Sequence, residues 1–402
     1  MRILVGLADV ANVASTYAKG FRALGHETFT VVWRKSYFYP DAEYDVVINK
    51  HSSNGQTERS RSTKWAVWSS AGLGILQIPH ALTCDLFVLF GYSILPHHLY
   101  SPILKLLGKR IVFVFWGSDI RHWYPLQQEM RILGVDAEIQ PFIDYIRDHP
   151  ASSFHDKLRA VRNAERHADL ILSQPGYGQL QARPYMRANI PLDLSRFRFS
   201  VPDREVPLVL HAPSVPGVKG TEFVMAAVEQ LKREGVSFEF RLIQKMPNAQ
   251  LRELLTEADI VVDELFSETV GALSAESMAT GNAVLVRYMP EYARVPPGCP
   301  AVNVTKDSLC DRLREVILNR DLRHNLAYAG RPYVEANNDH VRITRQILDC
   351  LEAGDDCHHD FVPTFYQQLS IPRELFEQER KSGRTLRRQQ LSRLFSRSAK
   401  RS

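Results

Sequence analysis

The sequence predicts an α/β protein made of two doubly wound, Rossmann-like domains that face a central cleft. The chain has 402 residues, a length typical of two domains. In both halves, short apolar runs rich in β-branched and aromatic residues alternate with helical segments. This βαβ rhythm is typical of parallel sheets covered by helices on both faces. Because such sheets bind ligands at the carboxyl ends of their strands, we expect the functional site in the cleft.

The first half, residues 1–196, contains predicted strands joined by helices and loops. A helix is expected over residues 11–24, where Gly25 stops it, and a charged helix over 155–168. The polar, Ser-rich stretch 51–64 predicts a mobile loop. The strands are expected at residues 1–7, 29–33, 44–48, 86–90, 110–115 and 169–173.

A linker at residues 194–207 leads into the second half, which repeats the alternation. We assign residues 205–352 to the second domain, 353–379 to a C-terminal segment and 380–402 to a basic tail. The expected strands are 206–211, 238–243, 259–265 and 282–288, and the expected helical segments are 221–234, 249–258 and 308–351.

The composition is that of a soluble globular protein, with 45% hydrophobic and 24% charged residues. No apolar run is long enough to cross a bilayer, and the N-terminal run is too short for a signal peptide. The five cysteines form neither a CxxC pair nor a metal-binding spacing, which predicts a reduced, cytoplasmic protein. We interpret Cys357-His358-His359-Asp360 as a polar linker, because adjacent ligands converge poorly on one ion.

The charge is distributed unevenly along the chain. The net charge is +5, yet residues 380–402 alone hold nine Lys or Arg and no acid, so the rest of the chain is mildly acidic. In a helix, Leu391, Leu394 and Phe395 would share one face, and a basic amphipathic segment predicts peripheral contact with the inner face of a membrane. A solvated terminus is an equally good interpretation. Binding to nucleic acid is the weaker one, since the tail lacks repeated aromatic residues.

The most informative stretch is residues 267–281, which carries two carboxylates with seven residues between them. Glu268 lies in a glycine-containing turn after a predicted strand, and Glu276 lies in a short apolar helix that ends at Gly281. The turn would present backbone amides to an anion. Because a carboxylate repels phosphate, Glu268 is better explained by sugar hydroxyls. A buried Glu276 would need a partner such as a ribose diol, whereas the simpler interpretation is an exposed helical Glu.

A lysine in the second half completes this pattern. Lys219 precedes Gly220 and a predicted helix, a position that suits a diphosphate. The simpler interpretation is a solvated side chain before a glycine turn.

The chain resembles retaining GT-B glycosyltransferases of glycosyltransferase family 4, the group 1 glycosyl transferases. The resemblance is carried by Glu268-x7-Glu276 with Gly271, and by Met278-Ala279-x-Gly281-Asn-Ala-Val. It extends over nearly the whole chain. The other matching segments are Gly25-His-Glu, Lys105-Leu-Leu-Gly-Lys-Arg110, Gly117-Ser-Asp-Ile-Arg121, Ile190-Pro-Leu-Asp-Leu194, His211-Ala-Pro-Ser, Lys219-Gly-Thr and Ala258-Asp-Ile-Val-Val-Asp263.

The resemblance implies an acceptor-side first domain, a nucleotide-sugar-binding second domain, and a crossover role for residues 353–379. It implies that Glu268 holds the donor sugar, that Glu276 holds the ribose, and that Lys219 stabilises the departing nucleoside diphosphate. The residues implied to bind the donor are Glu276, Thr269, Val270, Gly271, His211 and Gly220.

The sequence departs from the family pattern at two places. Many relatives carry an Arg in the loop before the Lys-Gly pair, and residues 215–218 contain none. Relatives often have a His directly before the Gly-Ser-Asp element, where this chain has Trp116. We therefore expect Asp119, Arg121 or His122 to supply the catalytic contact of the first domain. Asp119 is the preferred candidate, and a structural cap is its alternative role.

The resemblance implies transfer of a hexose-type sugar from a nucleotide sugar, such as a UDP-sugar, with retention of anomeric configuration. The implied acceptor is a glycan or a polyprenyl- or other lipid-linked molecule, in synthesis of a surface polysaccharide or glycolipid. No Asp-x-Asp occurs in the sequence, so no metal or other cofactor is expected. The alternatives are a sugar-nucleotide epimerase or hydrolase on the same scaffold, and a non-catalytic glycosyltransferase-like subunit.

Overall fold

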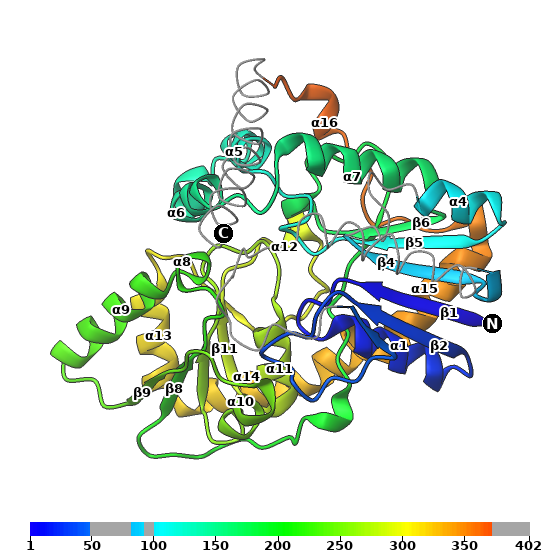
Figure 1. Ribbon diagram of the computed structural model, residues 1–402. Helices are drawn as coiled ribbons and strands as arrows, with labels where there is room; N and C mark the ends of the chain where they lie inside the picture. Colours follow the sequence, from blue (N-terminus) through cyan, green and yellow to red (C-terminus); the bar gives the residue numbers. More distant parts are fainter. Residues whose placement is uncertain (49–81, 92–99, 372–402) are drawn as a thin grey trace, which may run out of the picture.

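The computed structural model describes residues 1–48, 82–91 and 100–371. It has two domains, each built on a parallel β-sheet with helices packed against it (Figure 1). The expected loop at 51–64 and the basic tail at 380–402 lie outside the described residues. Within the described part of the chain, no helix is both long and apolar enough to cross a membrane.

The N-terminal sheet has seven strands in the order β3-β2-β1-β4-β5-β6-β7. Neighbouring strands pair in parallel throughout. β4 and β6 are buried along their whole length, which explains their unbroken apolar sequences. The strands are β1 Arg2–Leu7, β2 Glu27–Val32, β3 Val46–Val47, β4 Leu86–Phe90, β5 Arg110–Val114, β6 Leu170–Ser173 and β7 Met186–Arg187.

The helices of the N-terminal domain include three that were not predicted from the sequence. The predicted helices are α1 Val13–Ala23 and α7 Phe154–His167, and α7 begins at Ser153, whose side chain accepts the Asp156 amide. The additional helices are α4 Tyr100–Leu106, α5 Trp123–Ile132 and α6 Asp136–Asp148, together with the short 3₁₀ turns η2 Pro175–Tyr177 and η3 Leu194–Arg196.

The C-terminal sheet has five parallel strands in the order β12-β11-β10-β8-β9. The predicted strands are β8 Leu208–His211, β9 Glu239–Leu242, β10 Ile260–Val262 and β11 Ala283–Val286, and β12 Val302–Asn303 is additional. The helices around the sheet are α8 Pro216–Lys219, α9 Thr221–Arg233, α10 Asn248–Leu255, α11 Ala272–Thr280, α12 Pro290–Ala293, α13 Leu309–Leu318 and α14 Arg320–Asn337.

The chain returns to the N-terminal domain earlier than the predicted boundary at residue 353. Helix α15, His340–Ala353, packs on α1, and its apolar residues Ile343 and Ile347 join the core around β1. The approach is close, since a Cβ on Gly20 of α1 would lie 2.5 Å from the His340 carbonyl oxygen. The crossover therefore includes α15, followed by η4 Gly354–Asp356 and α16 Phe365–Gln368.

Helices α5 and α6 of the N-terminal domain reach across to the C-terminal domain, where α6 contacts α8 (Figure 1). The Phe142 ring stacks on Phe266, with 6.3 Å between their centroids. The buried Arg287 donates to Glu138 of α6 at 2.9 Å. Packing and charge thus hold the two domains together over the cleft.

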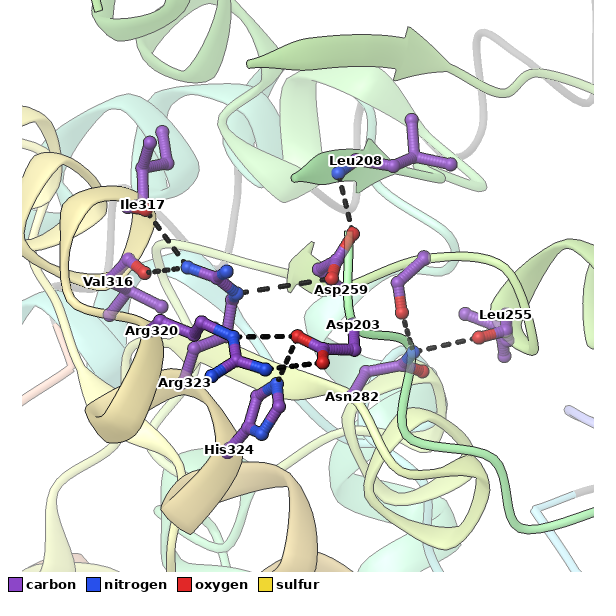
Figure 2. Close-up of polar contacts among 11 residues, drawn as sticks. Asp203, Leu208, Leu255, Asp259, Asn282, Val316, Ile317, Arg320, Arg323 and His324 are labelled. Carbon is purple, nitrogen blue, oxygen red and sulfur yellow. Dashed lines mark hydrogen bonds and ion pairs between the residues drawn. The ribbon is translucent and has the colours of Figure 1, made fainter. Parts of the chain in front are cut away.

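A buried polar network holds together the end of the C-terminal sheet that lies away from the cleft (Figure 2). Asp259 precedes β10 and accepts the Leu208 amide at 2.8 Å, while Asn282 precedes β11 and donates to the carbonyl of Leu255 at 2.8 Å. Arg323 of α14 lies 3.9 Å from Asp259 and donates to the Ile317 carbonyl at 2.9 Å. These contacts satisfy groups at the amino ends of the strands, so the network supports the domain and not the site.

The structure corrects the expectation of a fully reduced chain. Cys350 of α15 and Cys357 form a disulfide, with their Cα atoms 4.9 Å apart. The segment of Cys357-His358-His359-Asp360 that was interpreted as a polar linker is thereby attached to α15. Cys350 lies near the end of α15, and Cys357 lies in the turn that follows. The two meet only because the chain reverses at Gly354, whose φ is +58°, and this reversal was not predicted from the sequence.

Candidate active site between the two domains

A cavity of about 290 Å³ lies between the domains and is lined by residues of both. Its volume is near the lower end of the range for small-molecule sites. The C-terminal wall contains five residues that the sequence analysis selected, which are Lys219, Glu268, Thr269, Val270 and Gly271. The cavity adjoins the carboxyl ends of β8 and β10, the position expected for a ligand in a doubly wound domain.

The turn that follows β10 is held in place by its own side chains. The Ser267 hydroxyl donates to the Thr269 carbonyl at 2.7 Å and accepts the Thr269 amide at 3.2 Å. Asp263 accepts both the amide and the hydroxyl of Ser274, at 3.1 and 2.7 Å, in the first turn of α11. A Cβ on Gly271 would lie 2.6 Å from a carboxylate oxygen of Glu264, so a larger residue there would displace the Glu264 side chain.

Glu268 is buried at the boundary between the domains. Its side chain lines the cavity, and its Oε1 atom has no hydrogen-bond partner among the described residues. The carboxyl group packs directly on the backbone of Gly176 in η2, where there is no room for a Cβ atom. A buried carboxylate oxygen without a partner is costly, and a ligand hydroxyl in the cavity would satisfy it.

Glu276 occupies a separate place outside the cavity lining, so the structure does not bring the two predicted acids into one cavity. It is 5% exposed and accepts two hydrogen bonds from the Asn248 amide group, at 3.1 and 2.9 Å. The Tyr39 hydroxyl of the N-terminal domain donates to it at 3.2 Å. Burial raises the pKa of Glu276 to about 7, although the hydrogen bonds from Asn248 and Tyr39 favour the ionised form.

Lys219 lines the cavity, but two carboxylates surround its ammonium group. The nitrogen lies 3.2 Å from Asp263 and 2.9 Å from Glu264. Burial opposes the charge on Lys219, yet these carboxylates outweigh burial and raise its pKa. Burial raises the pKa of Glu264 in turn. Lys219 is therefore a paired cation and not the solvated side chain of the simpler interpretation.

Three other predicted site residues do not line the cavity. His211 is 1% exposed, and its ring nitrogens bond to the Val262 carbonyl at 2.8 Å and the Thr221 hydroxyl at 2.9 Å. Burial lowers the pKa of His211, which favours the neutral ring. Gly220 packs against Leu265 with φ +72°, a conformation suited to glycine. Both residues support the backbone of the C-terminal wall without lining the cavity.

Asp119 is the third predicted site residue that does not line the cavity, and its carboxylate is hydrogen-bonded to backbone amides of its own turn. It accepts the amides of Trp116 at 3.2 Å, Gly117 at 2.9 Å and Ile120 at 3.0 Å. This arrangement is the structural cap considered as the alternative role. His122 is likewise buried and caps α5 through the Tyr124 amide at 3.2 Å. Of the three candidates in this segment, only Arg121 lines the cavity.

Several cavity residues of the N-terminal domain were not predicted from the sequence. Trp116 contributes an indole N–H that is buried without a partner among the described residues. Arg187 of β7 contributes a guanidinium group whose Nη1 donates to the Arg294 carbonyl. The loop after β1 contributes Val10 and Ala11. Each of these residues lies at or just beyond the carboxyl end of a strand. Many other residues of the chain occupy such positions, so the position alone does not identify a cavity residue from the sequence.

The chain was compared with known proteins. Its sequence matches no protein-family model and none of the curated proteins. The fold is similar to that of a sucrose-phosphate synthase from Thermosynechococcus elongatus, with a TM-score of 0.58 and 12% identity, covering 87% of this chain and 97% of the other. It is also similar to Anabaena HepE in complex with UDP-glucose, with a TM-score of 0.57 and 14% identity, covering 88% and 100%.

A third similar structure is WaaG, a glycosyltransferase involved in lipopolysaccharide biosynthesis. It matches with a TM-score of 0.53 and 14% identity, covering 88% of this chain and 100% of the other. At such low identities a likeness establishes the fold and not the activity. The predicted fold class is therefore confirmed, since the chain has the GT-B fold of two Rossmann-like domains that face a cleft.

Proposed function

We propose that this protein is a glycosyltransferase that uses a nucleotide sugar as donor. The observation that carries the proposal is the interdomain cavity, where Glu268, the amide turn 269–271 and Lys219 line one wall. An acid without a partner, a glycine turn and a cation are the groups that a sugar diphosphate needs. The fold supports the proposal, because the similar protein HepE was solved with UDP-glucose.

The donor would lie along the C-terminal wall. Glu268 would accept hydroxyl groups of the sugar, and the backbone of Thr269, Val270 and Gly271 would meet the sugar and the phosphates. Glu276 would bind the ribose diol after Tyr39 has left it. The separate positions of the two acids suit an elongated ligand that is held at both ends.

In the proposed reaction, the bond between the anomeric carbon and the phosphate oxygen breaks, and the acceptor oxygen bonds to the same carbon. The acceptor proton passes to the leaving phosphate on the same face, which retains the anomeric configuration. No separate strong base is then needed. Catalysis consists of positioning the acceptor and stabilising the charge of the leaving group, for which Lys219 is the cation of the C-terminal domain.

The proposed donor is a hexose linked to a nucleoside diphosphate, with UDP the first base to test, and the proposed acceptor is a glycan or a polyprenyl- or other lipid-linked molecule. The proposed pathway is synthesis of a surface polysaccharide or glycolipid. Peripheral membrane contact through residues 380–402 would suit a lipid-linked acceptor. We propose that side-chain cations, and no metal ion, balance the charge of the diphosphate.

The test is a transfer assay with labelled UDP-, GDP- and ADP-hexoses and a mixture of glycan and polyprenyl-linked acceptors. We expect one donor to give a product with the unaltered protein, and Glu268→Gln to lower that rate at least 100-fold without changing the unfolding temperature. Donor consumption at the same rate without acceptor would instead indicate an epimerase or a hydrolase. Donor binding without any consumption would indicate a non-catalytic subunit. This alternative is considered because residues 215–218 lack the arginine that many relatives carry.

A further inference from the structure

The C-terminal wall of the cavity carries more negative than positive charge. Lys219 is its cation, and two carboxylates already pair with that group. Glu268 adds a further carboxylate on the same wall. A diphosphate placed there would meet a wall with a net negative charge, and like charges at such distances repel. If the site binds a diphosphate, the compensating charge has to come from the N-terminal wall.

Arg121 and Arg187 are the cations that the N-terminal wall offers. Arg187 already donates to the Arg294 carbonyl. The guanidinium group of Arg121 has no hydrogen-bonding or ion-pair partner among residues 1–48, 82–91 and 100–371, and its central carbon lies 4.6 Å from the centroid of the Phe142 ring. A guanidinium stacked on an aromatic ring keeps its N–H groups available at the edges for an anion.

The turn around Arg121 is organised to present this side chain. The Asp119 carboxylate binds three amides of the turn, and the Arg121 amide donates to the Gly117 carbonyl at 2.6 Å. The Phe142 ring that supports Arg121 stacks in turn on Phe266, which directly precedes the turn 267–271. Arg121 is therefore fixed relative to the opposite wall through Phe142. This assigns Asp119 a positioning role.

Arg121 lies at the sugar end of the proposed donor. A Cβ on Gly117 would lie 3.2 Å from Nη2 of Arg121 and 3.6 Å from the Tyr177 ring. Tyr177 follows Gly176, on which the carboxyl group of Glu268 packs. Glu276, the acid proposed for the ribose, is not part of this cavity. The phosphate next to the sugar is therefore closer to Arg121 than the phosphate next to the ribose.

We propose that Arg121 binds the sugar-proximal phosphate of the donor and of the leaving diphosphate, and so replaces the arginine missing from residues 215–218. The inference rests on the proposed function, since it requires a diphosphate in the cavity. It also explains how the first domain takes part without the histidine that Trp116 replaces.

The test measures the binding of UDP, GDP and ADP, and of the matching monophosphates, by titration calorimetry. For the base that binds best, Arg121→Gln is expected to weaken diphosphate binding 10- to 100-fold, as expected for loss of a charge-assisted hydrogen bond, and monophosphate binding less than threefold. Arg121→Lys keeps the charge and should recover part of the loss. The matched control is Arg131→Gln, an exposed arginine of α5 that pairs with Asp136, which should change neither affinity.

The outcomes separate this inference from the proposed function. If the unaltered protein binds none of the diphosphates, both are wrong. If it binds a diphosphate and Arg121→Gln binds it equally well, or loses diphosphate and monophosphate to the same extent, only the assignment of Arg121 is overturned. Equal unfolding temperatures of Arg121→Gln and the unaltered protein would exclude a folding defect as the cause of a loss.

Discussion

The Tyr39 hydroxyl donates a hydrogen bond to Glu276 over 3.2 Å, so a side chain of the N-terminal domain occupies the acid proposed for the donor ribose. The contact is part of a larger seam between the domains. The backbone amide of Asn248 donates to the Phe38 carbonyl at 2.6 Å, and the Tyr37 hydroxyl donates to the Lys245 carbonyl at 3.1 Å. A ribose diol and Tyr39 would therefore compete for one carboxylate.

Tyr39→Phe is expected to tighten nucleoside diphosphate binding by about 2- to 10-fold, because the donor no longer displaces a hydrogen bond worth about 0.5–1.5 kcal/mol. Calorimetric titration measures the change. Tyr37→Phe is the matched control, since it removes an interdomain hydrogen bond without touching Glu276, and it should leave the affinity unchanged. Weaker binding by Tyr39→Phe would show instead that Tyr39 contacts the donor.

The raised pKa of Glu276 predicts a pH-dependent stability. Its pKa of about 7 in the folded chain lies above the ordinary glutamate value of 4.5. The folded state therefore binds more protons between these values, and stability falls as the pH rises from about 4.5 through 7. Glu276→Gln removes this dependence. In urea unfolding, we compare the free energy of unfolding of Glu276→Gln with that of the unaltered protein. We expect this difference to favour the variant more at pH 8 than at pH 5, by on the order of 3 kcal/mol. The same difference at both pH values would contradict the prediction.

Lys219→Ala is expected to destabilise the C-terminal domain as well as to abolish transfer. The change leaves Asp263 and Glu264 adjacent and buried without their cation, and breaking a buried pair costs about 3–5 kcal/mol. Chemical denaturation measures this loss. Lys219→Ala combined with Glu264→Gln should recover part of the stability, whereas Lys232→Ala, at an exposed position of α9, should have little effect. A double variant as unstable as Lys219→Ala would contradict the pairing.

Chelation tests the proposed metal independence. We expect EDTA to leave the transfer rate unchanged, because Lys219 and Arg121 supply the positive charge that a metal ion would otherwise bring to the diphosphate. The measurement compares initial rates with EDTA and with added MgCl2 or MnCl2. A rate that collapses in EDTA and returns with either metal would refute this part of the proposal.

Much of the architecture was predictable because it is encoded locally. The apolar runs at Leu86–Phe90 and Arg110–Val114 can only be buried strands, and Gly281 ends α11 in the left-handed conformation that favours glycine. The turn 267–271 was identified from its glycine and from the strand before it. These features depend on neighbours within a few residues, which the sequence displays directly.

The helices α5 and α6 show the limit of such reasoning. Their residues Leu126, Ile139 and Phe142 complete a core that belongs largely to the C-terminal domain. An amphipathic pattern shows that a helix has an apolar face, but it does not identify the surface that will cover that face. The same holds for α15, which continues a helical series of one domain and packs on the other.

The sequence by itself determined the two βαβ domains, the amide turn after β10, and the residue types that would suit a sugar diphosphate, because each follows from periodicity and from chemistry at short separation. Only the tertiary structure decided that Lys219 is paired, that Glu276 is covered by Tyr39, and that Arg121 faces the cavity while Asp119 does not. Those facts depend on contacts between residues far apart in the chain, which exist only once packing has brought the domains together.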